Sequence, residues 1–481
     1  MNHSAIRKII GLELKLEAAF FAVPLITAII YQEKQGWYYL AVALCCLAFG
    51  FILSHRKAEH RTIFAKEGFV AVGLGWVVMS FFGALPFTLS GEIPSFVDAM
   101  FETISGFTTT GASILTDVEA LTHTALIWRS FTHWIGGMGV MVFILMILPK
   151  GGAYNMHIMR AESPGPSVGK LVPRIKDTAT ILYAIYIAMT IIEAILLLLA
   201  GMPLFDSLCT SFGTAGTGGF GIRRDSFASY SVLIQVITAV FMILFGVNFN
   251  AYYYLRKKED RKNILKMEEV KVYFIIIVIA VLIITFDILS MCTGFGDALN
   301  KAFFQVGSII TTTGFATDDF NLWPSLSKTI LVVLMFCGAC AGSTGGGIKV
   351  SRIIIMLKSV VFEIKRYTHP NRINTIKLDG KTLDKGVIKG VTGYLTTYAA
   401  IFIASILLIS LNNFDFTTNF TAVAATFNNI GPGLEMVGPT GSFADFNALS
   451  KIVFMFDMLA GRLELYPMLI LFYPKIWTKN V

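Results

Sequence analysis

The feature that most constrains this chain is a series of apolar runs spaced along its whole length. Runs at 181–200, 272–289 and 399–411 approach the roughly 20 residues that an α-helix needs to cross the hydrocarbon core of a membrane. Only 15% of the residues are charged, whereas soluble proteins carry about 25%. The chain is therefore predicted to be an all-α integral membrane protein without a separate soluble domain.

The positive charge of the chain is concentrated in certain connecting segments. The formal net charge is +8, and most Lys and Arg residues lie at 55–66, 150–176, 256–271 and 349–389. Loops rich in Lys and Arg stay on the cytoplasmic side, so these segments predict a multi-pass protein of the cell membrane with a cytoplasmic N-terminus. The segments on the other side carry Asp117, Glu119, Asp318, Asp319, Glu435 and Asp445. No basic patch with aromatic stacking residues is visible, so nucleic acid is not an expected partner.

One order of segments recurs four times along the chain. A long apolar segment is followed by a short one, then by a glycine-containing break rich in Thr or Asn, and then by another segment predicted to be a full-length helix. The breaks lie in "MFETISGFTTTGAS", "LFDSLCTSFGTAGTGGFG", "KAFFQVGSIITTTGFATDDF" and "FTAVAATFNNIGPGL". Two further helices are predicted near 14–31 and 37–53. About ten spanning helices and four short ones are therefore expected.

This recurrence divides the chain into five parts. The two N-terminal helices occupy 1–66, and the four tandem units of helix, loop and helix occupy 67–150, 171–260, 270–366 and 387–481.

The four breaks place polar backbone at membrane depth. Irregular backbone survives there only where it is buried in protein or lines a wet cavity. One such break could be a simple turn between helices, but four at corresponding places favour a shared cavity. Glycine allows successive carbonyls to point the same way, and Thr adds hydroxyl oxygens. Rings of neutral oxygens can replace the water shell of a monovalent cation, and acids at the outer mouth would concentrate cations there.

These motifs resemble those of one membrane-protein family. The stretches "SGFTTTGAS", "TTTGFATDDF", "FNNIGPGL", "CAGSTGGGIKVSR" and "AGRLELYP" are similar to the membrane subunit of Trk-type potassium-uptake systems, within the Trk/Ktr/HKT superfamily of cation transporters. The resemblance covers nearly the whole chain. It implies four pore loops around a pseudo-fourfold pore, with one strand of a selectivity filter from each unit.

The resemblance also assigns the residues of that filter. The filter glycines would be Gly111, Gly314 and Gly431, and in the second unit either Gly216 or Gly219, of which Gly219 is favoured. The filter residues would be Thr109, Thr110, Gly111, Thr217, Gly218, Gly219, Thr312, Thr313, Gly314, Asn429, Ile430 and Gly431. Potassium would bind at Thr110, Gly111, Thr217, Gly218, Thr312, Thr313, Asn429 and Ile430.

A second glycine cluster interrupts the last helix of the third unit. By resemblance, residues 338–352 form an intramembrane loop that obstructs the pore in its closed state, and Arg462 lies against that loop. The gate residues would be Gly342, Ser343, Thr344, Gly345, Gly346, Gly347, Lys349 and Arg462. The alternatives are a static kink for the loop and a structural ion pair of Arg462 with Asp457 or Glu464.

The predicted function is potassium uptake through a gated, channel-like pore. The alternative is an alternating-access carrier coupled to protons or sodium, since carriers also contain broken helices. An enzyme is not expected, because none of the seven histidines belongs to an H-E-x-x-H motif, and no covalent cofactor is expected; potassium is the substrate. The partners implied are membrane lipid, a second copy in a homodimer and a separate cytoplasmic nucleotide-binding regulatory ring.

Overall fold

The structure is a computed structural model and confirms the all-helical prediction. It describes residues 1–55, 65–139, 175–256, 261–264, 266–369 and 375–477. Within these ranges the only strands are β1 (Lys377–Leu378) and β2 (Lys381–Thr382), which form one short antiparallel pair. Two of the basic segments considered above, 55–66 and 150–176, lie largely outside the described residues.

In the described residues, a long helix, a short helix and a third helix follow one another in this order four times. The long ones are α4 (Ala65–Ser90), α9 (Ile175–Leu199), α14 (Glu268–Asp287) and α18 (Lys385–Ile409). The short ones that follow are α5 (Phe96–Phe107), α10 (Leu204–Gly216), α15 (Phe295–Ile310) and α19 (Phe416–Phe427). The third ones are α6 (His123–Met138), α11 (Val232–Phe245), α16 (Ser325–Cys337) and α20 (Ala448–Arg462).

The remaining helices lie at the two ends of the chain and in its connections. They are α1 (His3–Phe20), α2 (Ala22–Tyr31), α3 (Gly36–His55), α12 (Phe249–Arg256), α13 (Arg261–Ile264), α17 (Val350–Thr368) and α21 (Tyr466–Leu471). The 3-10 turns are η2 (Leu289–Met291), η3 (Phe320–Leu322), η4 (Ser410–Asn412), η5 (Glu435–Val437) and η6 (Pro474–Ile476).

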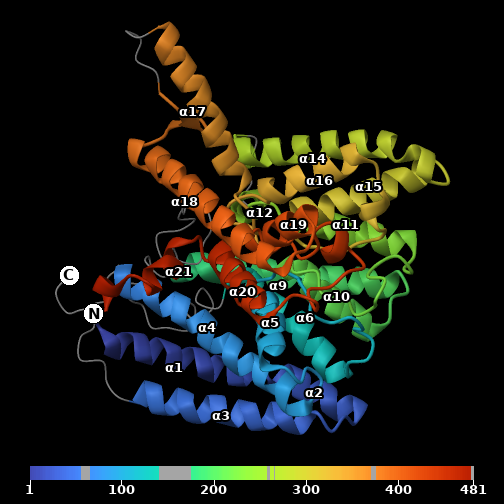
Figure 1. The fold of residues 1–481 in the computed structure, drawn as a ribbon, viewed down its shortest axis with the longest axis vertical. Helices are drawn as coiled ribbons and strands as arrows, with labels where there is room; N and C mark the ends of the chain where they lie inside the picture. The colour runs from blue at the N-terminus through green and yellow to red at the C-terminus, as the bar shows by residue number, and fades with distance from the viewer. Residues whose placement is uncertain (56–64, 140–174, 257–260, 265, 370–374, 478–481) are drawn as a thin grey trace.

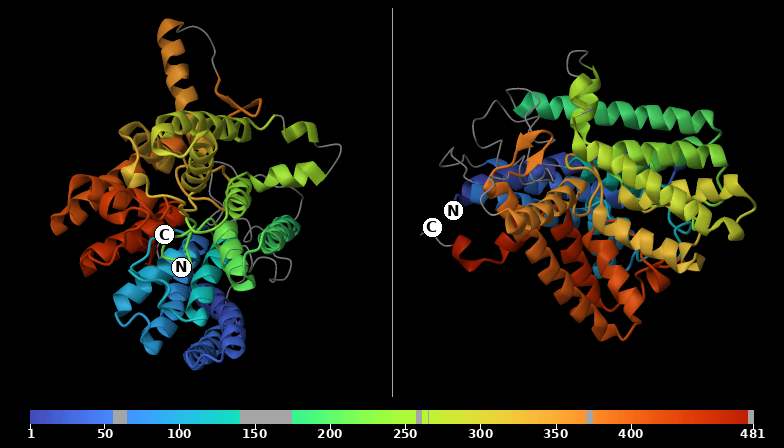
Figure 2. Two further views of the ribbon diagram at one scale, coloured as in Figure 1. Left: turned by 90° about the vertical axis from the view of Figure 1, so that its right-hand side faces the viewer. Right: turned by 90° about the horizontal axis from the view of Figure 1, so that it is seen from above.

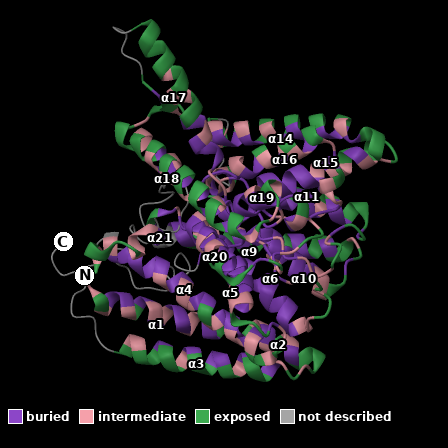
Figure 3. Cartoon of the chain, in the orientation of Figure 1, coloured by how far each residue is buried: buried purple, intermediate pink, exposed green. Residues whose placement is uncertain are grey.

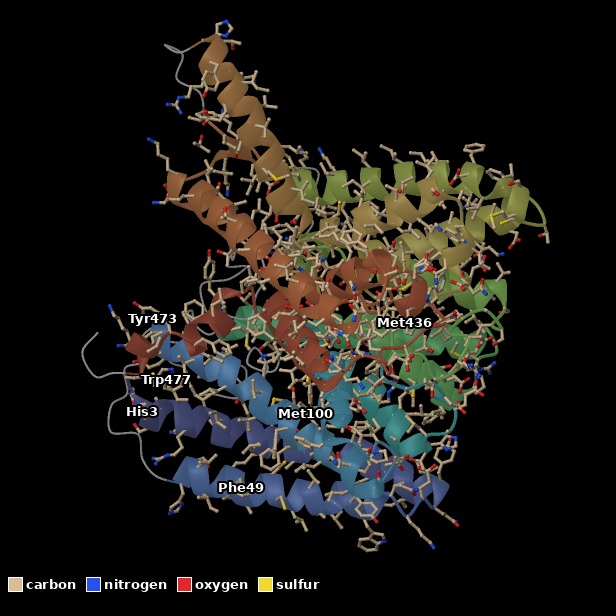
Figure 4. All side chains as sticks on the ribbon, viewed as in Figure 1. His3, Phe49, Met100, Met436, Tyr473 and Trp477 are labelled. Atoms are coloured by element: carbon tan, nitrogen blue, oxygen red, sulfur yellow. The ribbon has the colours of Figure 1, made fainter. Side chains whose placement is uncertain are left out.

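The helices are arranged around a common centre. In the left panel of Figure 2, blue and cyan helices lie below this centre, green ones to its right, yellow ones above it and red ones to its left. The N-terminus and α21 lie at one end of the molecule in Figure 1, and α17 projects away from the body. In Figure 4, His3, Tyr473 and Trp477 lie toward that end, whereas Met436, which follows the fourth break, lies on the opposite side.

Burial separates the short helices from the outer ones. Figure 3 shows the buried residues concentrated at the centre and the exposed ones on helices such as α3, α17 and α18. Nine of the 12 residues of α19 are buried. The outer surface of α9 exposes large apolar side chains, with Leu199 exposed by 79%. An apolar outer surface around a polar centre suits a lipid environment.

The described residues contain fewer long apolar helices than the ten spanning helices predicted. Five described helices are long and apolar enough to cross a membrane, at 36–55, 66–90, 178–199, 268–287 and 385–412, and a sixth if α11 and α12, bent by 94°, form one span. The third helices were predicted to be full-length, which is wrong for α11, α16 and α20. They have 14, 13 and 15 residues. Glycine-containing segments that begin at Gly246 and Gly338 follow α11 and α16, and a break with positive φ at Glu464 and Leu465 follows α20. The residues of the first unit beyond 139 lie outside the described ranges.

The first helix also begins earlier than predicted. It starts at His3 rather than near residue 14 and is interrupted only at Phe21. Charged residues in its first turns hide it from a hydropathy criterion. Gly11 of α1 and Gly50 of α3 make this hairpin tight, because a Cβ on Gly11 would lie 3.0 Å from the Gly50 carbonyl oxygen. Phe21 then stacks on Trp128 of α6 at 4.4 Å between ring centroids, which joins the hairpin to the first unit.

The loop between α2 and α3 caps α6 through one carboxylate. Glu33 accepts hydrogen bonds from the backbone N–H groups of His123 and Thr124 at 2.9 and 2.8 Å. Burial raises the pKa of Glu33, but the hydrogen bonds from Thr124 and His123 outweigh it, so the pKa lies below its ordinary value.

This cap predicts a pH-dependent contribution to stability. A lowered carboxyl pKa contributes stability that is present above the ordinary pKa and is lost as the pH falls through the lowered value. Glu33→Gln should therefore lower the stability at pH 7 by about 1 kcal/mol, the usual value of a cap. Thermal unfolding in detergent between pH 7 and 3 measures this. The variant and the native protein should converge at the acid end, and a constant difference would contradict the prediction; Glu363→Gln, at an exposed site, is the control.

Candidate functional site

Each short helix ends in a break with the same backbone geometry. The first or second residue after the helix has a positive φ, which is 55° at Thr109, 55° at Thr217, 59° at Thr312 and 55° at Asn429. Such angles are uncommon for residues with a Cβ. A glycine with positive φ follows two residues later in every case, at Gly111, Gly219, Gly314 and Gly431.

The hydrogen bonds of the four breaks are also the same. The residue between each pair donates its N–H to a carbonyl five residues earlier at 2.8 Å: Thr110 to Ser105, Gly218 to Gly213, Thr313 to Ser308 and Ile430 to Ala425. The N–H groups are thus turned back toward the short helix. The carbonyl oxygens of these four residues accept no hydrogen bond from the described part of the chain. Buried carbonyls without a donor are suited to bind a cation.

The four breaks contact one another in cyclic order. A Cβ added at Gly111 would overlap the Gly218 carbonyl oxygen, and one at Gly219 would overlap that of Thr313. One at Gly314 would overlap the Ile430 oxygen, and one at Gly431 would lie 2.8 Å from the Thr110 oxygen. The breaks therefore close a ring in which each glycine leaves room for a carbonyl of the next segment. We call residues 109–111, 217–219, 312–314 and 429–431 the ring segments.

The second ring segment distinguishes Gly219 from Gly216. Gly219 has the positive φ of 76° and the cross-segment carbonyl contact that the other three glycines show. Gly216 is instead the last residue of α10, where a Cβ would overlap the backbone of His133. The geometry of the ring therefore groups Gly219 with Gly111, Gly314 and Gly431.

A cavity of about 110 Å³ opens on one side of the ring. All four ring glycines line it, and so do Arg129, Arg223 and Arg224. The expected acids do not line this cavity: Asp318 pairs with Lys301 at 3.0 Å, and Glu119 accepts a hydrogen bond from the Arg224 backbone. Among the described residues, arginines and none of the predicted acids line this cavity. In the described residues no group of three or more His, Cys, Asp or Glu side chains could hold a metal.

The glycine cluster between α16 and α17 forms an irregular loop on the other side of the ring. We call residues 338–349 the inner loop. Gly346 donates its N–H to the Thr312 hydroxyl at 2.6 Å. A Cβ on Gly345 would lie 2.8 Å from the Thr311 carbonyl oxygen, and one on Gly346 would lie 2.5 Å from that of Asn428. The inner loop thus packs directly against the third and fourth breaks.

Arg462 is bonded to carbonyls of this region. Its guanidinium donates to the carbonyl of Thr344 at 2.7 Å, and to those of Gly136 and Gly137 at 2.6 and 2.7 Å. Glu464, considered above as a partner of Arg462, pairs with Arg352 instead. Lys349, also buried, donates to the Gly345 carbonyl.

Two sets of hydrogen bonds that support the site were not predicted from the sequence. Glu269, at the start of α14, accepts the N–H groups of Ala341 and Ser351 at 2.7 and 3.0 Å and so joins the inner loop to the first turn of α17. The Asn429 side chain donates to the Thr110 hydroxyl at 2.8 Å and to the Met458 carbonyl at 2.9 Å. The sequence does not reveal these pairings, because Ala341 lies 72 positions from Glu269 and Thr110 lies 319 positions from Asn429.

The fold and this site define a multi-pass membrane transport protein with a polar ring at its centre. A family model described as a cation transport protein, TrkH, matches residues 39–479. The chain is 38% identical to the Trk system potassium uptake protein TrkH of Salmonella typhimurium and 37% identical to that of Escherichia coli K12, with 100% of each chain covered. The crystal structure of the potassium transporter TrkH from Vibrio parahaemolyticus matches with a TM-score of 0.88 and 34% identity, over 99% of this chain and 100% of that one.

The protein belongs to the TrkH family of cation transport proteins, the membrane subunits of Trk-type potassium-uptake systems. This is a transporter family and not a family of enzymes.

Proposed function

We propose that this protein takes up potassium through a gated, channel-like pore whose selectivity filter is the ring. The observation that carries this proposal is the cyclic contact of four glycines with four free carbonyls. The names of the relatives supply the ion, since they are potassium uptake proteins. The four units at 67–150, 171–260, 270–366 and 387–481 are then the repeats of a pseudo-fourfold pore, with 1–66 as an added hairpin.

The chemistry of the ring suits a dehydrated monovalent cation. Carbonyl and hydroxyl oxygens from the four segments replace the water shell without adding fixed negative charge, whereas a calcium site uses several carboxylates. The short helices α5, α10, α15 and α19 end at the ring, so their partially negative C-terminal ends favour a cation there. The bound ion is held at Thr110, Gly111, Thr217, Gly218, Thr312, Thr313, Asn429 and Ile430.

The inner loop acts as the gate in this proposal. It lies against the ring on the side away from the cavity, and its glycines let the backbone change shape at low energetic cost. Arg462 anchors the loop through Thr344 and adds a positive charge that opposes cation passage. Loop displacement then opens the path.

The partners and the orientation follow from the outer surface. With a cytoplasmic N-terminus, the projecting helix α17 also lies on the cytoplasmic side, where its Lys and Arg residues face an acidic regulatory ring or lipid headgroups. The apolar side chains of α17 are exposed, with Tyr367 at 86%, and a groove separates α17 from α18. A second copy in a homodimer would cover this apolar surface.

Currents through single molecules test the proposal against an alternating-access carrier. Purified protein in planar bilayers should give unitary potassium currents, and the reversal potential between potassium and sodium solutions should show preference for potassium. A carrier gives no unitary steps. Potassium flux that saturates without unitary steps, and that requires a proton or sodium gradient, would replace the channel proposal with the carrier.

A further inference from the structure

His133 of α6 connects the first two repeats by two hydrogen bonds, which fit one tautomer of the uncharged imidazole. Its Nδ1 lies 2.9 Å from the Gly106 carbonyl oxygen, which can only accept a hydrogen bond, so Nδ1 carries the proton. Its Nε2 accepts the N–H of Phe220 at 3.3 Å, so Nε2 is unprotonated. His133 is fully buried. Its two hydrogen bonds connect the end of the first short helix to the residue after Gly219.

Arg129 lies one helical turn from His133 and contacts the same two repeats. Its guanidinium pairs with Glu102 of α5 at 2.7 Å, and both side chains are at least 98% buried, with exposed fractions of 2% and 0%. Glu102 also accepts the N–H of Ile114 at 3.0 Å, just beyond the first ring segment. Arg129 reaches the Gly221 carbonyl of the second repeat at 3.4 Å.

Phe220 is contacted by both of these α6 residues. The Arg129 guanidinium carbon lies 4.1 Å from the centroid of the Phe220 ring, and the His133 ring centroid lies 4.2 Å from it. Residues four apart on a helix share one face, so α6 presents both groups to the residue that follows Gly219.

We propose that Arg129 and His133, with Glu102 as the counter-charge, are positioning residues that set the spacing of the first and second ring segments and thereby the preference for potassium over sodium. This inference rests on the proposed function of the ring. In the described residues, the hydrogen bonds that join the other neighbouring breaks involve uncharged groups: Phe227 to Ala316, Asn321 to Glu435, and Asn429 to Thr110.

The buried ion pair gives this junction its rigidity. Both charges are removed from water, so each depends on the other and on the backbone groups around it, and their positions are fixed together. Loss of one charge would leave the other without its partner and would let the first two segments shift. A ring that can contract fits the smaller sodium ion better than a fixed one does.

Ion selectivity of matched variants tests the inference. The reversal potential between potassium and sodium is measured in planar bilayers for Glu102→Gln, Arg129→Gln and Arg129→Lys. The first two should raise sodium permeability relative to potassium by about tenfold, which corresponds to about 1.4 kcal/mol. Arg129→Lys keeps the charge without the planar fork and should give a smaller rise. Phe220→Leu removes the ring that Arg129 and His133 contact and leaves no charge unpaired, so it should shift selectivity in the same direction. This variant tests the inference if the charge variants fail to accumulate in the membrane.

Two further variants separate the possible failures. Asp98→Asn breaks the ion pair between Lys451 of α20 and Asp98 of α5, whose charged atoms are 2.6 Å apart. Neither residue belongs to a ring segment, so this variant should leave selectivity unchanged. Gly314→Ser alters the ring itself. If Gly314→Ser changes the selectivity but the Arg129, Glu102 and Phe220 variants keep native selectivity, the inference is overturned and the proposal that the ring is the filter stands. Native selectivity in Gly314→Ser as well overturns the proposed function.

Discussion

Gly314→Ser should abolish selective potassium uptake while the protein still accumulates in the membrane. Gly314 has a φ of 91°, and a Cβ at this position would overlap the Ile430 carbonyl oxygen. The new side chain must displace that carbonyl or distort its own backbone, so two of the four ring segments lose their geometry together. We expect loss of growth in low potassium when the variant is expressed in a bacterium that lacks its own potassium uptake, or new sensitivity to sodium.

The matched control for this change lies on the helix that leads to the same segment. Gly296 is on α15, and a Cβ there meets no atom within 4 Å, so Gly296→Ser should support native growth. Both variants are compared at equal membrane abundance, and rubidium uptake is measured with and without sodium. Equal growth of the native protein and Gly314→Ser in low potassium would refute the assignment of Gly314 to the filter.

The ring glycines could be predicted from the sequence because the constraint on them is local. Each break follows a short apolar helix, and a glycine two residues after a Thr or Asn is needed for one particular backbone path. That path requires a positive φ, which residues other than glycine seldom adopt, so a glycine occurs at the same place in all four breaks. The spacing in the second break stayed ambiguous because α10 itself ends in glycine at Gly216.

The supporting side chains could not be predicted because their partners are distant in the sequence. Glu102 and Arg129 are 27 positions apart, and Glu269 lies 72 positions from Ala341, whose N–H it accepts. Glu269, at the start of a long apolar helix, is indistinguishable in the sequence from an acid at the membrane surface. Its hydrogen bonds, and the ion pair of Glu102 with Arg129, form only when the helices pack together.

The charges around the cavity next to the ring could not be predicted from the sequence either. Asp318 is near Gly314 in the sequence, but its carboxylate turns to Lys301 of the preceding short helix. The cavity is lined instead by Arg223 and Arg224, which belong to the loop after the second ring segment. Charge counts along a chain predict the side of the membrane, but the charge at one opening depends on how each loop folds.

Arg462→Gln should increase potassium flux in the absence of any partner protein. The substitution removes the hydrogen bonds that a charged guanidinium donates to carbonyls of Thr344, Gly136 and Gly137. Hydrogen bonds from charged groups contribute about 1.5–3 kcal/mol each, so loss of even one could shift a closed loop toward the open state by tenfold or more. The Arg462 positive charge near the proposed ion path is removed as well. Rubidium influx into proteoliposomes that contain only this protein measures the change.

Arg462→Lys separates the two contributions of this side chain. Lysine retains the charge but has no planar fork to bridge three carbonyls. If anchoring of the loop dominates, Arg462→Lys should increase flux nearly as much as Arg462→Gln does; if repulsion of the cation dominates, Arg462→Lys should stay close to native. Arg366→Gln, at a surface position of α17 that is 69% exposed, controls for loss of a positive charge. Unchanged or lower flux in Arg462→Gln at equal reconstitution would mean that the inner loop is a fixed support for the ring and that the gate lies elsewhere.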